Sequence, residues 1–459
     1  MILFNNIICQ FLIFEIILLC NSKLLFVNVH FRHGARGPLL LDKGNDLLGN
    51  KWQKRGILTP RGKRQVFLNG IKHREKYSNF LNEEYLEDEI KAYSTDSYRA
   101  ISSLECYLNG LYHNSNLNEN IIVDDLTIYP PGNISKKMKN MTNILGINAI
   151  PKDNHIIPIN IFQKSDHSFV LHEPGKISDC QTITKIRQNI LLQDKFKNLI
   201  EEFNLKFKEK LKNFFISNNI TINFDYNHEK INIFCDTLYS DLTDNRDITN
   251  LEKEGIQIEE LNQFCINILS IVQKDIVAGN KDIVMMSQTP PIKKLLKWMD
   301  ERIELDKKGE SNKIISGSPK YTIWSGHDSS ISTIQKFITL IFGTKWSFPS
   351  FSSTVLFELH KNENINKTNG NIYELRYIVN DEILLKIDYF KFKDIVNENL
   401  WTQEKIDNFC QFSIINIMKM NIRLKKYQYI ILIISLILLI SIFFNIRNFF
   451  KAKRKQKEY

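Results

Sequence analysis

The stretch FRHGARGP (Phe31–Pro38) carries the strongest signal in this chain. It follows the apolar, β-branched run LLFVNVHF, which predicts a buried strand over Leu24–Phe31. Directly after that strand, Arg32 and Arg36 flank His33, and two guanidinium groups this close repel each other unless an anion lies between them. The same cations lower the pKa of the imidazole and so favour its neutral, nucleophilic form. A solvated basic loop is the alternative interpretation, but it fits poorly behind so apolar a strand. We therefore interpret the stretch as a phosphate site that contains a nucleophile.

Two further motifs follow, each just after a segment that predicts a short strand. KAYSTDSYRA places Arg99 after Ile90–Tyr93, and YTIWSGHDSSI places His327 and Asp328 after Tyr321–Ser325. Together with FRHGARGP, these motifs resemble the active-site signature of the histidine acid phosphatases, the second branch of the phosphoglycerate-mutase-like superfamily. The weaker segments GILTPRG and FSSTVLFELH fit the same order, so the resemblance extends over most of residues 24–410.

The resemblance implies phosphoryl transfer without a metal ion or another cofactor. Four side chains are expected to bind the phosphate: Arg32, Arg36, Arg99 and His327. His33 is expected to attack phosphorus and to carry a phosphohistidine. Asp328 is the expected general acid for the leaving alkoxide, and it then deprotonates the attacking water. Because Asp328 has to hold a proton although nearby arginines lower its pKa, we expect activity at acidic pH.

Two positions depart from the family pattern. Tyr93 stands where the family usually has an arginine, and Tyr98 stands where it often has an aspartate. Both are expected to loosen the surroundings of Arg99. Structural interpretations also exist: Arg99 alone would be an ordinary surface arginine, and Asp328 would cap a helix that begins at Ser329. No sequence pattern indicates a zinc site, a P-loop or a dinucleotide-binding loop.

Both ends of the chain predict membrane-related segments. The first 20 residues are almost entirely apolar and predict a signal peptide over residues 1–22, with an uncleaved anchor as the alternative. Residues 427–446 contain no charge and are long enough to span a bilayer as a helix. The basic segment 447–459 behind them is expected to stay in the cytosol. We therefore expect a single-pass type I membrane protein with its catalytic domain in the lysosomal or vacuolar lumen or outside the cell.

Sequons and cysteines agree with a secretory route. Four sequons are candidate glycosylation sites: Asn133, Asn140, Asn219 and Asn366. By the resemblance, Cys180 and Cys410 match a disulfide pair of the family, and Cys265 is the nearest replacement partner for Cys235. Cys106 is then expected to remain as a buried free thiol.

The resemblance implies an α/β fold, with a doubly wound phosphoglycerate-mutase-like core, a mostly helical cap insert and a C-terminal transmembrane helix. The core is expected at residues 23–115 and 265–410, the cap insert at 116–264, and a juxtamembrane segment at 411–426. The site is expected outside the carboxyl ends of the core strands.

The leading hypothesis is a membrane-anchored acid phosphatase that hydrolyses phosphate monoesters. The alternatives are a specialist inositol polyphosphate or lysophosphatidic acid phosphatase, or a non-catalytic surface receptor with this fold. A net charge of +10 does not indicate a nucleic-acid partner, because basic residues are mixed with acidic ones over most of the chain outside the C-terminal tail, and no arginine-aromatic patch is present. By the resemblance, a homodimer is plausible.

Overall fold

The computed structural model describes residues 22–42, 44–113, 135–145, 157–162, 180–220, 227–363 and 372–410. The chain divides into two compact units: Met1–Ile177 with Ile186–Leu400, and Ser178–Lys185 with Trp401–Tyr459. The first unit contains the sheet and most of the expected insert. Residues 401–410, which we expected to complete the core, belong to the second unit.

The expected signal peptide and transmembrane helix lie outside the described residues, as do the juxtamembrane segment and the basic tail. Ser22, which we expected to end the signal peptide, is the first residue of a strand. Within the described ranges, no helix combines the length and apolar character needed to cross a membrane.

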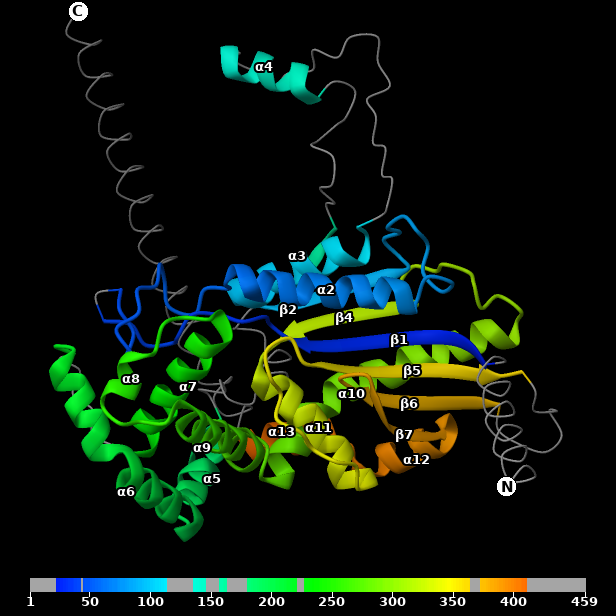
Figure 1. Ribbon diagram of the computed structural model, residues 1–459. Coiled ribbons are helices and arrows are strands. Elements are labelled where there is room, and N and C mark those ends of the chain that lie inside the picture. The colour runs from blue at the N-terminus through cyan, green and yellow to red at the C-terminus, as the bar shows by residue number, and fades with distance from the viewer. Residues whose placement is uncertain are drawn as a thin grey trace, which may run out of the picture. The chain divides into compact units, whose positions relative to one another are not determined.

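The described part of the first unit is built on a seven-stranded mixed sheet (Figure 1). Its strand order is β3-β2-β4-β1-β5-β6-β7. The strands are β1 Ser22–Arg32, β2 Ile90–Thr95, β3 Ile159–Phe162, β4 Tyr321–Gly326, β5 Thr354–Asn362, β6 Tyr373–Val379 and β7 Glu382–Asp388. Strands β1 to β4 pair in parallel, whereas β5 to β7 add an antiparallel half beside β1. The expected α/β class is confirmed. The expectation of a doubly wound core did not include the antiparallel half that β5, β6 and β7 form.

Helices cover both faces of the central strand β1. Because side chains alternate along a strand, Val27 and Val29 share one face and Phe26 points to the other. Val27 and Val29 belong to a buried cluster that includes Leu104 of α3, whereas Phe26 contacts Trp298 of α10. The helices of this core are α2 Pro60–Lys76, α3 Tyr98–Leu111, α10 Lys281–Lys307, α11 Asp328–Phe342 and α12 Tyr389–Asn399. Because helices cover both faces of β1, apolar side chains are favoured at most of its positions, which explains the apolar run in its sequence.

The expected insert is mostly helical, with two corrections. Its described elements besides β3 are α4 Lys136–Leu145, α5 Gln181–Leu191, α6 Asp194–Ser217, α7 His228–Asp244, α8 Asn250–Lys253 and α9 Ile258–Ile271. Strand β3 lies within the expected insert but pairs with β2 of the core sheet. The expected boundary at 264/265 falls inside α9, which continues into the π-helical turn Val272–Val277.

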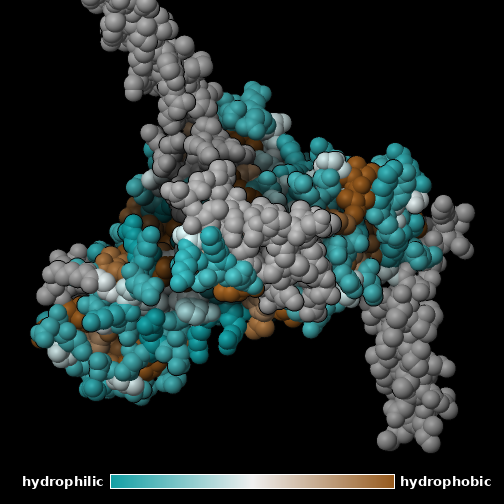
Figure 2. Space-filling model, turned by 90° about the horizontal axis from the view of Figure 1, so that it is seen from above, coloured by the Kyte–Doolittle hydropathy of each residue, from teal (hydrophilic) through white to brown (hydrophobic). Residues whose placement is uncertain are grey.

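The insert helices have their own hydrophobic core. Phe203 and Phe207 of α6 pack with Phe234 of α7 and Phe264 of α9. A disulfide between Cys235 and Cys265 joins α7 to α9, the pair that we expected. The charged residues of α6 lie on its outer side, and hydrophilic side chains dominate the described part of the face shown in Figure 2.

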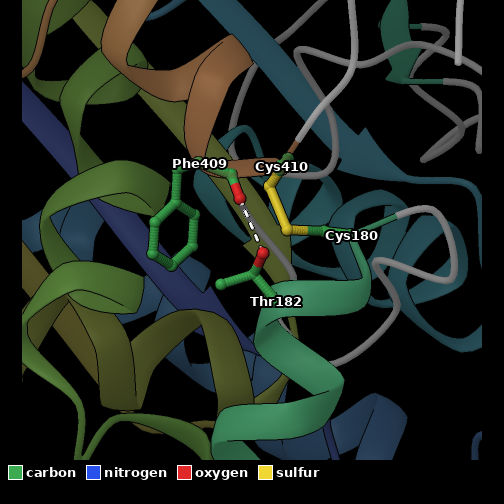
Figure 3. Close-up of a disulfide and its surroundings, with 4 residues drawn as sticks. All are labelled: Cys180, Thr182, Phe409 and Cys410. Atoms are coloured by element: carbon green, nitrogen blue, oxygen red, sulfur yellow. Dashed lines mark hydrogen bonds between the residues drawn. A yellow bond between two sulfur atoms is a disulfide. The ribbon is translucent and has the colours of Figure 1, made fainter. Parts of the chain in front are cut away.

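The second unit is cross-linked by a disulfide between Cys180 and Cys410 (Figure 3), again the expected pair. Thr182 lies beside it and donates a hydrogen bond from Oγ1 to the carbonyl oxygen of Phe409 at 2.7 Å. Cys410 is the last residue of α13 (Gln403–Cys410), so the cross-link fixes this helix to the chain around Cys180.

The described residues include the remaining cysteine and the asparagines of two of the four sequons. Cys106 is free, but it is half-buried on α3 rather than buried as expected. Asn140 and Asn219 are exposed, as glycosylation requires. Asn133 and Asn366 lie outside the described residues.

Candidate active site

Three parallel strands end at the same edge of the sheet and bring the three motifs together. β1 ends at Arg32, β2 at Thr95 and β4 at Gly326, and β4 pairs with both of the others. Parallel strands of an α/β sheet place the residues that follow their carboxyl ends in a common crevice. The motif residues therefore meet although more than 200 positions separate His33 from His327 along the chain.

The loop after β1 is held against the start of α2 by two glycines. A Cβ atom added to Gly34 would lie 2.2 Å from the carbonyl oxygen of Gly62, so no larger residue fits there. Thr59 caps α2, since its hydroxyl accepts a hydrogen bond from the backbone N–H of Gly62 at 3.0 Å. The GILTPRG segment thus positions the loop that carries His33.

His33 is buried, and one of its ring nitrogens is oriented toward the arginines. Its Nδ1 lies 2.8 Å from the carbonyl oxygen of Gly34, which can only accept, so Nδ1 carries the proton. The lone pair is then on Nε2, which accepts a hydrogen bond from Nε of Arg99 at 3.0 Å. Burial and then the charge of Arg99 lower the pKa of His33 well below its ordinary value of 6.5. The imidazole is therefore neutral and nucleophilic.

Arg99 also links His33 to the third motif. Its Nη2 lies 3.0 Å from Nδ1 of His327, and the other ring nitrogen of His327 lies 3.0 Å from Oγ1 of Thr95. Since a guanidinium can only donate, Nδ1 of His327 accepts and Nε2 donates to Thr95. Burial, followed by repulsion from Arg36, lowers the pKa of Arg99 to about 10. In this structure His327 bridges Arg99 to β2.

Asp328 forms an ion pair with Arg32. Nη2 of Arg32 lies 3.0 Å from Oδ2 of Asp328, while Oδ1 of Asp328 accepts a hydrogen bond from the backbone N–H of Ser329 at 2.8 Å. Burial alone would raise the pKa of the Asp328 carboxyl, but Arg32 and Arg36 outweigh burial and hold the pKa below its ordinary value. The helix begins one residue earlier than expected: His327 is its N-cap, and Asp328 is its first residue.

Arg36 is bound by an acidic residue of the insert. Nη2 and Nη1 of Arg36 lie 2.6 and 3.0 Å from the two carboxylate oxygens of Asp236 on α7. Ser240, one turn later on α7, accepts a third hydrogen bond at 3.3 Å. The Nε atoms of Arg32 and Arg36 are buried and have no hydrogen-bond partner among the described residues. These two donors are available to an anion.

The sequence profile of the histidine phosphatase superfamily (branch 2) matches residues 23–380. The chain belongs to this family. The matched range includes the residues of the three motifs, which meet at the carboxyl ends of β1, β2 and β4.

Relatives of known name match a shorter part of this histidine phosphatase. Human testicular acid phosphatase is 37% identical over 96 residues, which is 20% of this chain and 22% of the relative. Lysosomal acid phosphatase from Xenopus laevis is 38% identical over 103 residues, 22% of this chain and 24% of the relative. Each match therefore spans less than a quarter of the relative's length.

Solved structures share the fold over nearly their full length. Hafnia alvei phytase in complex with tartrate matches with a TM-score of 0.51 and 13% identity, over 83% of this chain and 98% of that one. The phytase from Citrobacter braakii matches with a TM-score of 0.51 and 14% identity over the same shares. At this identity the likeness concerns the fold of the histidine phosphatase.

The two departures from the family pattern lie outside the arginine cluster. Tyr93 stacks on Trp324 with ring centroids 4.2 Å apart, and the ammonium group of Lys294 lies 4.5 Å from the Tyr93 ring centroid. Tyr98 is 62% exposed at the start of α3. Arg99 itself contacts both histidines, and the expectation that these two tyrosines loosen its surroundings stays a prediction.

Sequence reasoning assigned no role to several residues that hold the cluster from outside the three main motifs. Phe351 lies under Arg32, with the guanidinium carbon 4.1 Å from the ring centroid, and Tyr239 of α7 stacks on the same ring at 4.9 Å. Asp236, Tyr239 and Ser240 follow an i, i+3, i+4 spacing and so share one face of α7. Because α7 has polar residues at many other positions as well, this spacing alone does not single them out in the sequence.

Proposed function

We propose that this histidine phosphatase is an acid phosphatase that hydrolyses phosphate monoesters through a phosphohistidine on His33. The observation that carries the proposal is the orientation of the imidazole: its Nδ1–H is fixed by the carbonyl oxygen of Gly34, and its Nε2 lone pair faces Arg99. A nucleophile presented to a cluster of guanidinium groups suits attack on a phosphate and few other groups.

The reaction then has two steps. In the first, Nε2 of His33 bonds to phosphorus, the ester P–O bond breaks, and the proton of Asp328 goes to the leaving alkoxide. In the second, Asp328 takes a proton from water, the water oxygen bonds to phosphorus, and the P–N bond breaks. Arg32, Arg36 and Arg99 would stabilise the charge on the three equatorial oxygens, and His327 would donate to phosphate only after giving up its bond to Thr95. Since Nε2 of His33 accepts from Arg99 before substrate binds, the phosphate would draw Arg99 away as it enters.

A second candidate function is the hydrolysis of esters with several anionic groups, such as inositol polyphosphates. Six exposed cations lie in the segment 51–64, which contains no acidic residue: Lys51, Lys54, Arg55, Arg61, Lys63 and Arg64. This basic segment adjoins the site, since a Cβ on Gly56 would lie 3.7 Å from Nη1 of Arg99. Such a surface favours substrates with a second phosphate.

We also infer that the catalytic unit works in a lumen or outside the cell, anchored by the predicted helix 427–446. The support is the name of the lysosomal relative, the two disulfides and the predicted signal peptide. We propose that the catalytic unit consists of the core and the cap, and that the cap contributes α7 to the site.

The direct test is hydrolysis of p-nitrophenyl phosphate by the full-length chain, produced through the secretory pathway and assayed with a chelator. The expected result is turnover at acidic pH that is lost in His33→Ala and kept in His228→Ala, a matched change at an exposed histidine. Equal activity in the His33→Ala variant, or no turnover by the folded wild type, would contradict the proposal.

A further inference from the structure

Among the described residues, Asp236 is the only carboxylate of the insert that binds one of the clustered arginines (Arg32, Arg36 and Arg99). Its side chain is 15% exposed and that of Arg36 is 4% exposed, so the pair is largely screened from water. Both carboxylate oxygens of Asp236 accept hydrogen bonds from Arg36, one from Nη2 at 2.6 Å and the other from Nη1 at 3.0 Å. A bidentate pair of this kind fixes the plane of the guanidinium as well as its position.

The pair leaves two N–H groups of Arg36 without a partner among the described residues. Nη1 also donates to the carbonyl oxygen of Gly37 at 3.1 Å and to Ser240, so Nη1 is fully occupied, whereas Nη2 uses only one of its two N–H groups, for Asp236. Nε is buried and has no hydrogen-bond partner among the described residues. With its plane fixed by Asp236, Arg36 keeps the edge formed by Nε–H and the second N–H of Nη2 for the phosphate.

Asp236 also changes the charge that acts on the proposed general acid. The charged or titratable groups that face Asp328 are Arg32, Arg36, Arg99 and His327. Arg36 is one of the two arginines that lower the pKa of Asp328. A carboxylate 2.6 Å from Arg36 opposes that effect, because its negative charge offsets part of the field of the guanidinium.

We propose that Asp236 is a positioning residue of the reaction, which orients Arg36 toward the phosphate and offsets its charge so that Asp328 can hold its proton. The inference rests on the proposed phosphatase function. It assigns to the helical insert a direct part in the chemistry, in addition to any part in substrate choice.

The test compares Asp236→Asn, which removes the charge and keeps the shape, with Asp236→Glu, which keeps the charge. The matched control is Asp244→Asn on the same helix, where the carboxylate pairs with Arg246 at 2.9 Å. The readout is kcat/KM across pH for an alkyl phosphate, whose alkoxide needs the proton of Asp328, together with thermal unfolding. We expect Asp236→Asn to lower kcat/KM about tenfold and to move the alkaline limb of the profile to lower pH, by about half a unit or more.

Asp236→Glu should restore the position of the limb, and Asp244→Asn should follow the wild type. A purely structural role would lower the unfolding temperature of Asp236→Asn and leave its pH profile unchanged, which would overturn the proposal. Higher activity in Asp236→Asn would also overturn it, because Asp236 would then only compete with phosphate for Arg36. Absence of turnover in the wild type and the Asp244→Asn control would instead refute the phosphatase function and, with it, this inference.

Discussion

Nε of Arg99 donates a hydrogen bond to Nε2 of His33 at 3.0 Å. The contact fixes which nitrogen of the imidazole has the lone pair, and it places a cation at that lone pair. An arginine there also keeps the imidazole from gaining a proton, because two positive charges this close repel each other. The nucleophile is thus kept available at the acidic pH where the proposed general acid works.

The first prediction concerns the pH dependence of catalysis. Asp328 gives its proton only below its pKa, and Arg32 and Arg36 hold that pKa below its ordinary value. His33 keeps its lone pair into acid because its pKa is well below 6.5. We therefore expect kcat/KM to be highest in acid and to fall about tenfold per pH unit on the alkaline limb.

Leaving-group dependence provides the control for this prediction. Asp328→Asn should lose about 10²–10⁴-fold of the rate on an alkyl phosphate, whose alkoxide needs a proton. The loss on p-nitrophenyl phosphate should be smaller, because its leaving group is a weak base. Equal losses on both esters would show that Asp328 does not act as the general acid.

The second prediction concerns stability in acid. Burial lowers the pKa of His73 to about 3, whereas the unfolded chain binds a proton near the ordinary value of 6.5. Below that value the unfolded state takes up a proton that the folded state does not, so the free energy of unfolding decreases as pH falls. From pH 7 to pH 5 this one group removes about 2 kcal/mol.

His33 and His327, whose pKa values are also lowered, act in the same direction. His73→Gln should therefore flatten the pH dependence of denaturant unfolding, and His228→Gln, at an exposed site, should leave the slope as it is. An unchanged slope in His73→Gln would show that His73 is protonated in the folded protein.

The third prediction concerns the disulfide that joins α7 to α9. Cys235 directly precedes Asp236, so the cross-link to Cys265 anchors the helix that binds Arg36. Replacing both cysteines by serine should lower the free energy of unfolding by about 3 kcal/mol through loop entropy. It should also lower kcat/KM, and Cys106→Ser, at the free cysteine, should do neither. Stability loss with full activity would contradict the link between this disulfide and the site.

Much of this site follows from local sequence, and the part that does not depends on distant contacts. His33 and Arg32 could be placed because a strongly apolar strand precedes them, and strand ends in an α/β sheet converge. Asp236 could not be placed, because its role exists only once α7 packs on the loop after β1. Strand β3 was missed for a similar reason: its four residues, INIF, are too few to establish a strand pattern, and only pairing with β2 makes them a strand.

The fourth prediction separates the two candidate substrate classes. The double variant Lys54→Ala with Arg55→Ala removes two exposed cations of the basic segment 51–64. Both residues precede Gly56, which lies next to Arg99. If the substrate has several phosphates, the double variant should raise KM for inositol hexakisphosphate about tenfold and leave KM for p-nitrophenyl phosphate nearly unchanged. Lys136→Ala with Lys137→Ala on α4 is the matched control. Equal effects on both substrates would argue for a simple monoesterase.

The central claim is covalent catalysis by His33, and trapping of the phosphoenzyme tests it most directly. The full-length chain would be mixed with a ³²P-labelled monoester at acidic pH and quenched in alkaline detergent, which preserves a phosphohistidine. We predict about one label per site, stable to alkali, released by acid, mapped to the peptide that contains His33 and absent from His33→Ala. Label on another residue, or turnover without any trapped label in a variant slowed at the second step, would contradict the account.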